Sequence, residues 1–166
     1  MDLVVRDGPE QVAQEAADVV CRVLAERPAA VLGLPTGRTP LALYEELARR
    51  RREGSVSFRR ATVFALDEVL GLREGDSRSF RATLQGAIVG RVDLDPTRFH
   101  SPTGEGSDYE GLIARAGGLD LVVLGIGRNG HIAFNEPGSD RASRTRRVAL
   151  APDTIEEMRA AFAPDP

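Results

Sequence analysis

Short apolar runs alternate with longer amphipathic stretches along this chain. The runs at 29–34, 61–66 and 119–124 are nearly continuous, which is typical of strands covered on both faces of a sheet. Between such runs, apolar residues recur at helical spacing, most clearly over 9–26. Strands that alternate with helices favour βαβ units. The pattern therefore predicts an α/β fold, a Rossmann-like open parallel sheet with helices on both faces.

Cap and turn residues give the limits of further helices. One helix is predicted to begin near Thr39, with Thr39 as its N-cap and a proline next, and to end at Gly54. Another is expected over 77–89, capped by Ser77 or Ser79. The shorter elements expected are strands at 3–5, 97–100 and 147–150, and helices at 107–116 and 153–162, the last capped by Asp153.

Composition limits the class of protein. The 166 residues are 42% hydrophobic, which suffices for one core, so a single domain over 1–166 is expected. The formal net charge of -3 and the mixed charges give no sign of a nucleic-acid partner. No window reaches the length of a membrane span and no signal-peptide layout is seen, so we expect a cytoplasmic protein without a membrane partner.

The cysteine and the histidines form no metal-binding pattern. Cys21 is alone, within a helical pattern, and is interpreted as a small buried or half-buried residue. The two histidines are not clustered with it, so no metal site is expected. His100 lies in a Ser/Pro/Gly-rich stretch and is expected on a surface loop.

Polar, glycine-rich segments follow three of the predicted strands. They are 35–40, the pair Asp67-Glu68, and 125–138. In open α/β sheets, ligands bind outside the carboxyl ends of the strands. On a parallel sheet the three segments share one edge, so we expect a binding site there.

The first of these segments suits a phosphate group. Gly37 lets backbone amides approach a ligand, and the segment opens a helix whose N-terminus is partly positive. Thr36 and Thr39 add hydroxyl donors. An ordinary strand-to-helix turn with a capping threonine is the alternative, and the loop alone does not decide between them.

Asp67 follows its apolar run directly. A carboxylate at a strand end, beside a partly apolar wall, is suited to act as a general base. A turn or helix-cap aspartate is the alternative, and the residues alone leave both open.

The third segment contains the pattern G-x-G-x-x-G at 125–130, which raises a dinucleotide site as an alternative. That site requires a helix to follow, and Pro137 opposes one; an acid is also missing twenty residues later, at Leu150. We interpret the glycines as hinges that aim His131 into the site, with Glu136 as its orienting carboxylate. No lysine and no G-x-S-x-G occur, which argues against a P-loop and a serine hydrolase.

Three motifs together resemble the glucosamine-6-phosphate deaminase family. They are LGLPTGRTP at 32–40, LDEVLGL at 66–72 and GIGRNGHIAFNEP at 125–137, and their order and spacing agree with that family. The resemblance extends over essentially the whole chain, including SRTR at 143–146. The related 6-phosphogluconolactonases share the glycine loop and a Gly-His element but differ after the histidine.

The resemblance implies a reaction in amino-sugar (N-acetylglucosamine) catabolism, in which glucosamine 6-phosphate and water give fructose 6-phosphate and ammonium. It implies that His131 moves the ring-opening proton with Glu136 assisting, that Asp67 carries the C2 proton to C1 through an enolamine, and that no cofactor is needed. Asn129 stands where some members have an aspartate that assists ring opening. The substrate-binding positions implied are Thr36, Gly37, Arg38, Thr39, Glu68, Gly127 and Ala133.

The sequence also departs from the family pattern. Arg38 replaces a small residue of the phosphate loop. The family's last strand–helix segment, with a phosphate-binding lysine, has no counterpart, and Arg159 lies one position from a phosphate-contacting arginine. Missing strands leave an exposed edge, so weaker stability or self-association as a homo-oligomer is expected. The alternatives are a sugar-phosphate-binding homologue without turnover and a lactone hydrolase.

Overall fold

A four-stranded parallel sheet lies at the centre of the computed structural model, which describes residues 2–102 and 108–162. The strand order is β3-β2-β1-β4, and every pairing is parallel. The predicted α/β class is therefore confirmed. The strands are β1 (Val31–Leu34), β2 (Thr62–Ala65), β3 (Phe99–His100) and β4 (Leu121–Val122).

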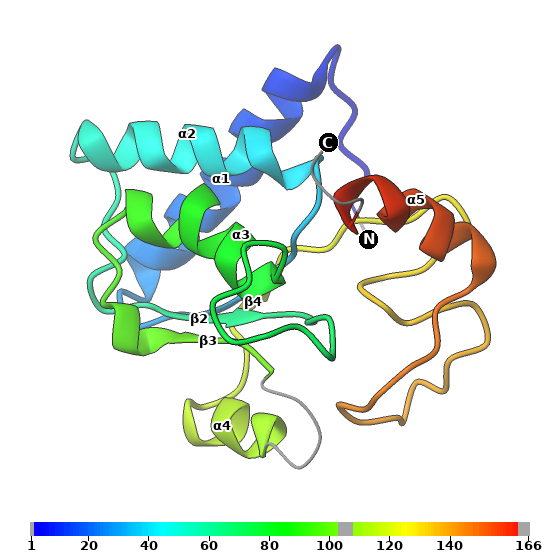
Figure 1. Ribbon diagram of the computed structural model, residues 1–166. Helices are drawn as coiled ribbons and strands as arrows, with labels where there is room; N and C mark the ends of the chain where they lie inside the picture. The colour runs from blue at the N-terminus through cyan, green and yellow to red at the C-terminus, as the bar shows by residue number, and fades with distance from the viewer. Residues whose placement is uncertain (1, 103–107, 163–166) are drawn as a thin grey trace.

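Helices cover both faces of the sheet, as predicted (Figure 1). One face carries α1 (Pro9–Glu26), α2 (Pro40–Arg52) and α3 (Phe80–Ala87), and the other carries α4 (Tyr109–Arg115). Short 3-10 turns lie at η1 (Val89–Arg91) and η2 (Pro96–Arg98), and α5 (Pro152–Phe162) lies beyond the edge of the sheet.

Alternation along the two central strands supplies both layers of the core. Leu32 and Val63 join the large cluster under α1, α2 and α3, whereas Phe64 on the opposite face meets Tyr109 of α4 at 5.6 Å between ring centroids. Fully burying side chains of this size contributes about 1.5–3 kcal/mol each. Tyr44, also buried, donates its hydroxyl to the Pro35 carbonyl at 2.5 Å, which anchors the segment after β1.

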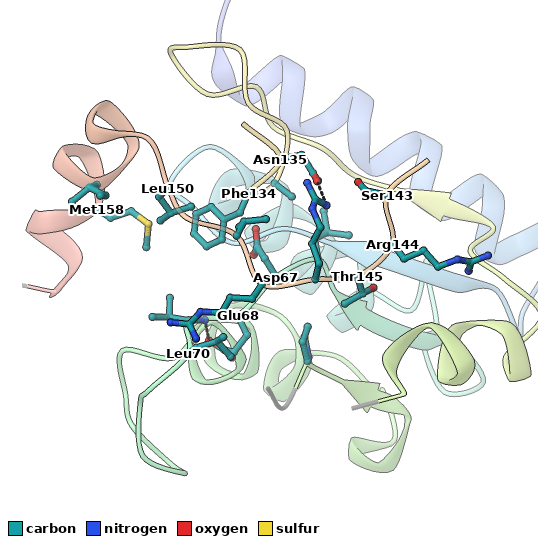
Figure 2. A pocket seen from close by; sticks show the side chains of 18 of the residues that line it. Asp67, Glu68, Leu70, Phe134, Asn135, Ser143, Arg144, Thr145, Leu150 and Met158 are labelled. Carbon is teal, nitrogen blue, oxygen red and sulfur yellow. Dashed lines mark hydrogen bonds between the residues drawn. The ribbon is translucent and has the colours of Figure 1, made fainter. Parts of the chain in front are cut away.

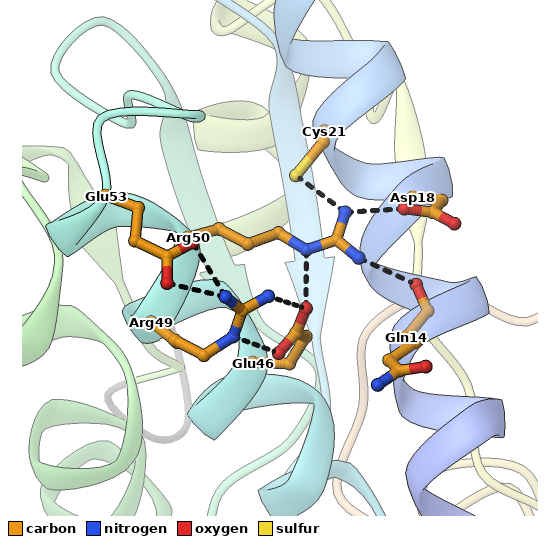
Figure 3. Close-up of polar contacts among 7 residues, drawn as sticks. All are labelled: Gln14, Asp18, Cys21, Glu46, Arg49, Arg50 and Glu53. Atoms are coloured by element: carbon orange, nitrogen blue, oxygen red, sulfur yellow. Dashed lines mark hydrogen bonds and ion pairs between the residues drawn. The ribbon is translucent and has the colours of Figure 1, made fainter.

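Arg50 joins α1 to α2 through a polar network (Figure 3). Its guanidinium donates to Glu46 at 2.7 Å and to Asp18 at 2.5 Å, and reaches the Cys21 sulfur at 3.7 Å. Cys21 is half-buried in α1, as the helical pattern predicted. Arg50, one of the arginines at the end of α2, therefore connects two helices of the fold.

The predicted helix limits are largely confirmed, but two caps differ. α1 spans 9–26 as expected, and the side chain of Ser79 accepts the Ala82 amide at the start of α3. Thr39 has helical backbone angles and its side chain makes no cap hydrogen bond. α5 begins at Pro152, so Asp153 lies in its first turn rather than capping it.

Several predicted strands are wrong or shorter because pairing depends on a neighbour that the local sequence does not reveal. Residues 3–5 and 147–150 form no strand, and Leu3 is 84% exposed. The run 119–124 pairs only at Leu121–Val122, because β4 is an edge strand with β1 on one side. It is not covered on both faces: Leu124 is 51% exposed. Residues 97–98 belong to a 3-10 turn.

His100 corrects another expectation. It lies in β3 rather than in a surface loop, and its ring packs against Phe64 at 4.8 Å between centroids. Burial lowers the pKa of this histidine. No helix in the described part of the chain is long and apolar enough to cross a bilayer.

Candidate active site

The segments that follow β1, β2 and β4 leave the sheet on the same side (Figure 1), as parallel pairing requires. The last of them also packs against the helix that follows β2 in the chain. Phe134, within the segment after β4, packs against Phe80 at the start of α3, with 5.5 Å between ring centroids. The prediction that these segments share one edge is confirmed.

Asp67 lies half-buried at the end of β2 and points into a cavity of about 880 Å³ (Figure 2). Burial, and then the neighbouring charge of Glu68, raise its pKa to about 6. A carboxylate with this pKa is mostly ionised at neutral pH, and its basicity suits the removal of a proton from a carbon atom near that pH. Its environment is that of a general base.

Both carboxylate oxygens of Glu68 are used to anchor the fold. Oε1 accepts the amides of Val69 at 2.9 Å and Phe80 at 2.8 Å, and Oε2 accepts the Arg81 amide at 2.8 Å and the Ser101 hydroxyl at 3.2 Å. The charge thus lies at the positive end of α3. Glu68 lines the cavity, but a role in binding substrate stays a prediction.

The cavity is large enough for a small molecule and has mixed walls. Apolar residues form one part, including Leu66, Leu70, Phe134, Leu150, Ile155 and Met158. Arginines contribute another part, and of these Arg144 pairs with Glu110 at 2.5 Å. Among the predicted site residues, Asp67, Glu68 and Ala133 line it. The Thr36–Thr39 loop and the His131 ring are not among its lining residues.

A second group of polar side chains surrounds His131. Its Nδ1 lies 2.9 Å from Asn129 Oδ1, 3.3 Å from the Thr154 hydroxyl and 3.9 Å from Glu136 Oε2. Asn129 Nδ2 donates to Glu136 Oε2 at 2.7 Å. Hydrogen bonds from Thr154, from the Ala151 amide and from Asn129 hold the pKa of Glu136 below its ordinary value. The predicted residues Asn129, His131 and Glu136 are therefore brought together.

The contacts of Asn129 also assign the tautomer of His131. Its Nδ2 faces a carboxylate, and its Oδ1 accepts the backbone N–H of His131 at 3.0 Å, so the amide orientation is fixed. Because Oδ1 can only accept, it favours a proton on the nearby Nδ1. The neutral ring then has Nε2 as its unprotonated nitrogen. An aspartate at position 129 would instead place a second negative charge against Glu136.

Glycine at position 127 makes room for the imidazole. A Cβ there would lie 2.1 Å from Cε1 of His131, so any side chain would collide with the ring. The Gly127 amide also donates to the His131 carbonyl at 2.9 Å. Gly127 was predicted to bind substrate; its contacts show that it holds the histidine, and substrate binding stays a prediction.

The turn after His131 is strained. Ala133 has a φ of 50°, the only positive φ of a non-glycine residue in the described part of the chain. The turn closes through the Asn135 amide, which donates to the Ile132 carbonyl at 3.0 Å. Such conformations cost about 1–3 kcal/mol and occur often at functional sites. Here the turn directs Ala133 and Phe134 into the cavity wall.

The predicted phosphate loop lies at the N-terminus of α2. Gly37 has a φ of 108°, which a side chain would disfavour, and residues 37–39 are exposed. Exposed backbone at the positive end of a 13-residue helix suits an anion. This geometry is compatible with phosphate binding by residues 36–39, which stays a prediction.

Sequence reasoning missed Thr154 in α5. Its side chain is 3% exposed and its hydroxyl lies among Asn129, His131 and Glu136. It stands 23 residues after His131, and no local pattern links the two. The signal available was a threonine in the first turn of a helix that follows the candidate loop.

Comparison with known proteins identifies the family. Residues 7–161 match the family described as glucosamine-6-phosphate isomerases/6-phosphogluconolactonase. The chain belongs to this family. The glucosamine-6-phosphate deaminase of Hahella chejuensis is 43% identical over 99% of this chain and 66% of its own length. That of an Arthrobacter species is 44% identical over 93% of this chain and 62% of its own length.

Solved structures of the family have the same fold. A monomeric glucosamine-6-phosphate deaminase superposes with a TM-score of 0.93 at 36% identity, covering 98% of this chain and 70% of its own. The 6-phosphogluconolactonase of Thermotoga maritima gives 0.65 at 24% identity, covering 80% and 62%, a likeness of fold alone. This chain spans about two thirds of the length of the curated relatives it matches.

Proposed function

We propose that this chain catalyses the isomerising deamination of glucosamine 6-phosphate, which yields fructose 6-phosphate and ammonium. The observation that carries the proposal is Asp67, a half-buried carboxylate with a pKa of about 6 that points into a cavity. The oriented His131–Glu136 pair lies in a segment that meets the same edge of the sheet. Membership of the family supports the choice of reaction.

In the first step the sugar ring opens. His131 takes the proton of the C1 hydroxyl on Nε2 and returns it to the ring oxygen, so that the C5 hydroxyl and a C1 aldehyde form. The imidazolium that exists between these transfers is stabilised by Glu136, whose Oε2 lies 3.9 Å from Nδ1. The low pKa of Glu136 keeps it ionised during this step.

In the second step Asp67 removes the proton from C2, and the proton that the C2 ammonium group releases goes to the aldehyde oxygen, which gives a neutral enolamine. Protonated Asp67 then delivers its proton to C1, which leaves an iminium ion at C2. Water adds to that carbon, ammonium leaves, and the C2 ketone of fructose 6-phosphate remains. A positioned acid or base of this kind contributes about 10²–10⁴-fold in rate.

The phosphate is assigned to residues 36–39, ahead of α2. Exposed amides, the hydroxyls of Thr36 and Thr39, and the positive helix end all favour an anion there. Arg38 adds a charge beside it. Binding energy from this remote group positions the reacting carbons.

Measuring fructose 6-phosphate and ammonium released from glucosamine 6-phosphate tests the proposal. Asp67→Asn keeps the shape but removes the base, so kcat should fall at least about 100-fold. Asp7→Asn, an exposed aspartate at the start of the chain, is the matched control and should leave kcat unchanged. In the unsubstituted chain kcat should fall about tenfold per pH unit below about pH 6, because Asp67 becomes protonated.

Three other results would change the assignment. Turnover that survives Asp67→Asn would remove Asp67 as the base. Hydrolysis of 6-phosphogluconolactone without deamination would assign the site to the other activity in the family's description. Thermal stabilisation by glucosamine 6-phosphate without product would indicate binding alone.

A further inference from the structure

The loop region, defined as residues 123–159, is held by very few buried groups. Thr154 is the only buried side chain among its described residues, and it is polar. A buried hydroxyl without partners costs about 1–3 kcal/mol, so its hydrogen bonds must compensate for its burial. The residues that surround it are those of the His131 group.

The hydrogen-bonding capacity of the hydroxyl matches its neighbours. A threonine hydroxyl offers one donor and two acceptor positions. Oγ1 faces two donors, Nδ1–H of His131 at 3.3 Å and Nδ2–H of Asn129 at 3.4 Å. Its own proton is then directed to the carboxylate of Glu136. All three positions are filled.

The direct path between imidazole and carboxylate is too long for a hydrogen bond. Nδ1 of His131 and Oε2 of Glu136 are 3.9 Å apart, beyond the roughly 3.6 Å at which a side-chain contact no longer counts as a hydrogen bond. The Thr154 hydroxyl and the Asn129 amide both touch the two groups. Thr154 is only 3% exposed, so it is not placed to contact a substrate directly.

We propose that Thr154 is a positioning residue whose hydroxyl bridges His131 and Glu136 and fixes the Nδ1–H tautomer of the ring. The catalytic consequence rests on the proposed function, whereas the bridge itself does not. Anchoring in α5 also gives the bridge a rigid base, because the Ala151 amide just before that helix donates to Glu136 Oε1 at 3.0 Å. The loop that carries His131 is thereby joined to a helix.

Three variants test the bridge. Thr154→Val keeps the shape and removes the hydroxyl, Thr154→Ala removes it in a smaller side chain that favours a helix, and Thr154→Ser keeps it. Thr83→Val is the control, because the exposed Thr83 hydroxyl of α3 donates to the carbonyl of Ser79, the residue just before that helix. If Thr154→Val does not fold, as judged by circular dichroism, Thr154→Ala and Thr154→Ser still give the comparison.

Kinetics give the first readout. Without the hydroxyl, kcat should fall about 10- to 100-fold with KM changed less than about threefold, and serine should restore kcat to within about threefold. A purely structural role would lower the amount of folded enzyme and leave the kcat of the folded fraction unchanged. Equal kcat in Thr154→Ala and Thr154→Ser would overturn the proposal.

Nitrogen-15 NMR of the imidazole gives a readout that needs no turnover. The chain has two histidines, so His131→Gln identifies the signals of His131. The unsubstituted chain and Thr154→Ser should show a protonated Nδ1 and an unprotonated Nε2, and Thr154→Ala a mixture of tautomers. A predominant Nε2–H form in the unsubstituted chain would overturn the bridge even if deamination is found. Absence of deamination with the expected tautomers would refute only the proposed function.

Discussion

The packed layer, residues 9–100, and the loop region are stabilised by different forces. In the packed layer, apolar side chains from α1, α2, α3 and the strands form one continuous cluster. Among the described residues of the loop region there is no such cluster, and hydrogen bonds around His131 and the buried Thr154 hold the chain instead. Stability therefore resides mainly in the first region, and the geometry of the chemistry depends on the second. The two should respond differently to substitution.

The largest effect on stability should come from the packed layer. Leu47 of α2 is fully buried, and truncation to alanine leaves a cavity, so Leu47→Ala should lower the free energy of unfolding by about 2–5 kcal/mol. Leu41→Ala, in the same helix but 43% exposed, should cost less than about 1 kcal/mol. Urea denaturation of both variants measures the difference. Similar losses in both would contradict the assignment of the core to this layer.

The loop region should instead lose activity without losing much stability. Gly127→Ala places a Cβ against the His131 ring and should lower kcat about 100-fold through displacement of the imidazole, with a small change in unfolding free energy. Gly125→Ala is the matched control, because a Cβ there meets open space and the backbone φ is not positive. Steady-state kinetics and urea denaturation of the pair separate the two effects. Equal activity in both variants would show that the ring does not need this space.

The same contrast explains what the sequence could predict. β1 and β2 are central strands, and continuous apolar runs such as 29–34 and 61–66 reveal them locally. Edge strands depend on partners, so residues 3–5 and 147–150 were wrongly predicted as strands, and 119–124 was predicted too long.

The candidate site divides in the same way. Asp67, His131 and Glu136 could be found because each follows an apolar run in a polar segment. The roles of Glu68 and Thr154 could not, because each depends on residues at least 12 positions away that only the fold brings near. Local patterns thus identify acids and bases, and the tertiary structure decides which groups hold them.

The smallest expected effect is on the free energy of unfolding, which ionisation of the half-buried Asp67 lowers. The pKa of Asp67 is raised from 3.8 to about 6 in the folded chain, so the folded state binds the proton more tightly than the unfolded state. The resulting stabilisation is present in full below about pH 4 and is lost as the pH rises through about 6. Two pKa units correspond to about 2.7 kcal/mol, which partial solvent exposure reduces to about 1–2 kcal/mol.

Asp67→Asn cannot ionise and should therefore be more stable than the unsubstituted chain by about 1–2 kcal/mol at pH 7.5, with the gain vanishing near pH 4. Urea denaturation at both pH values measures it. Asp7→Asn should show no such pH-dependent gain, since Asp7 is exposed. A gain for Asp67→Asn that persists at pH 4 would mean that packing rather than charge burial is responsible. A gain confined to high pH, in a variant that has lost turnover, would show that this carboxylate is kept at a cost to the fold.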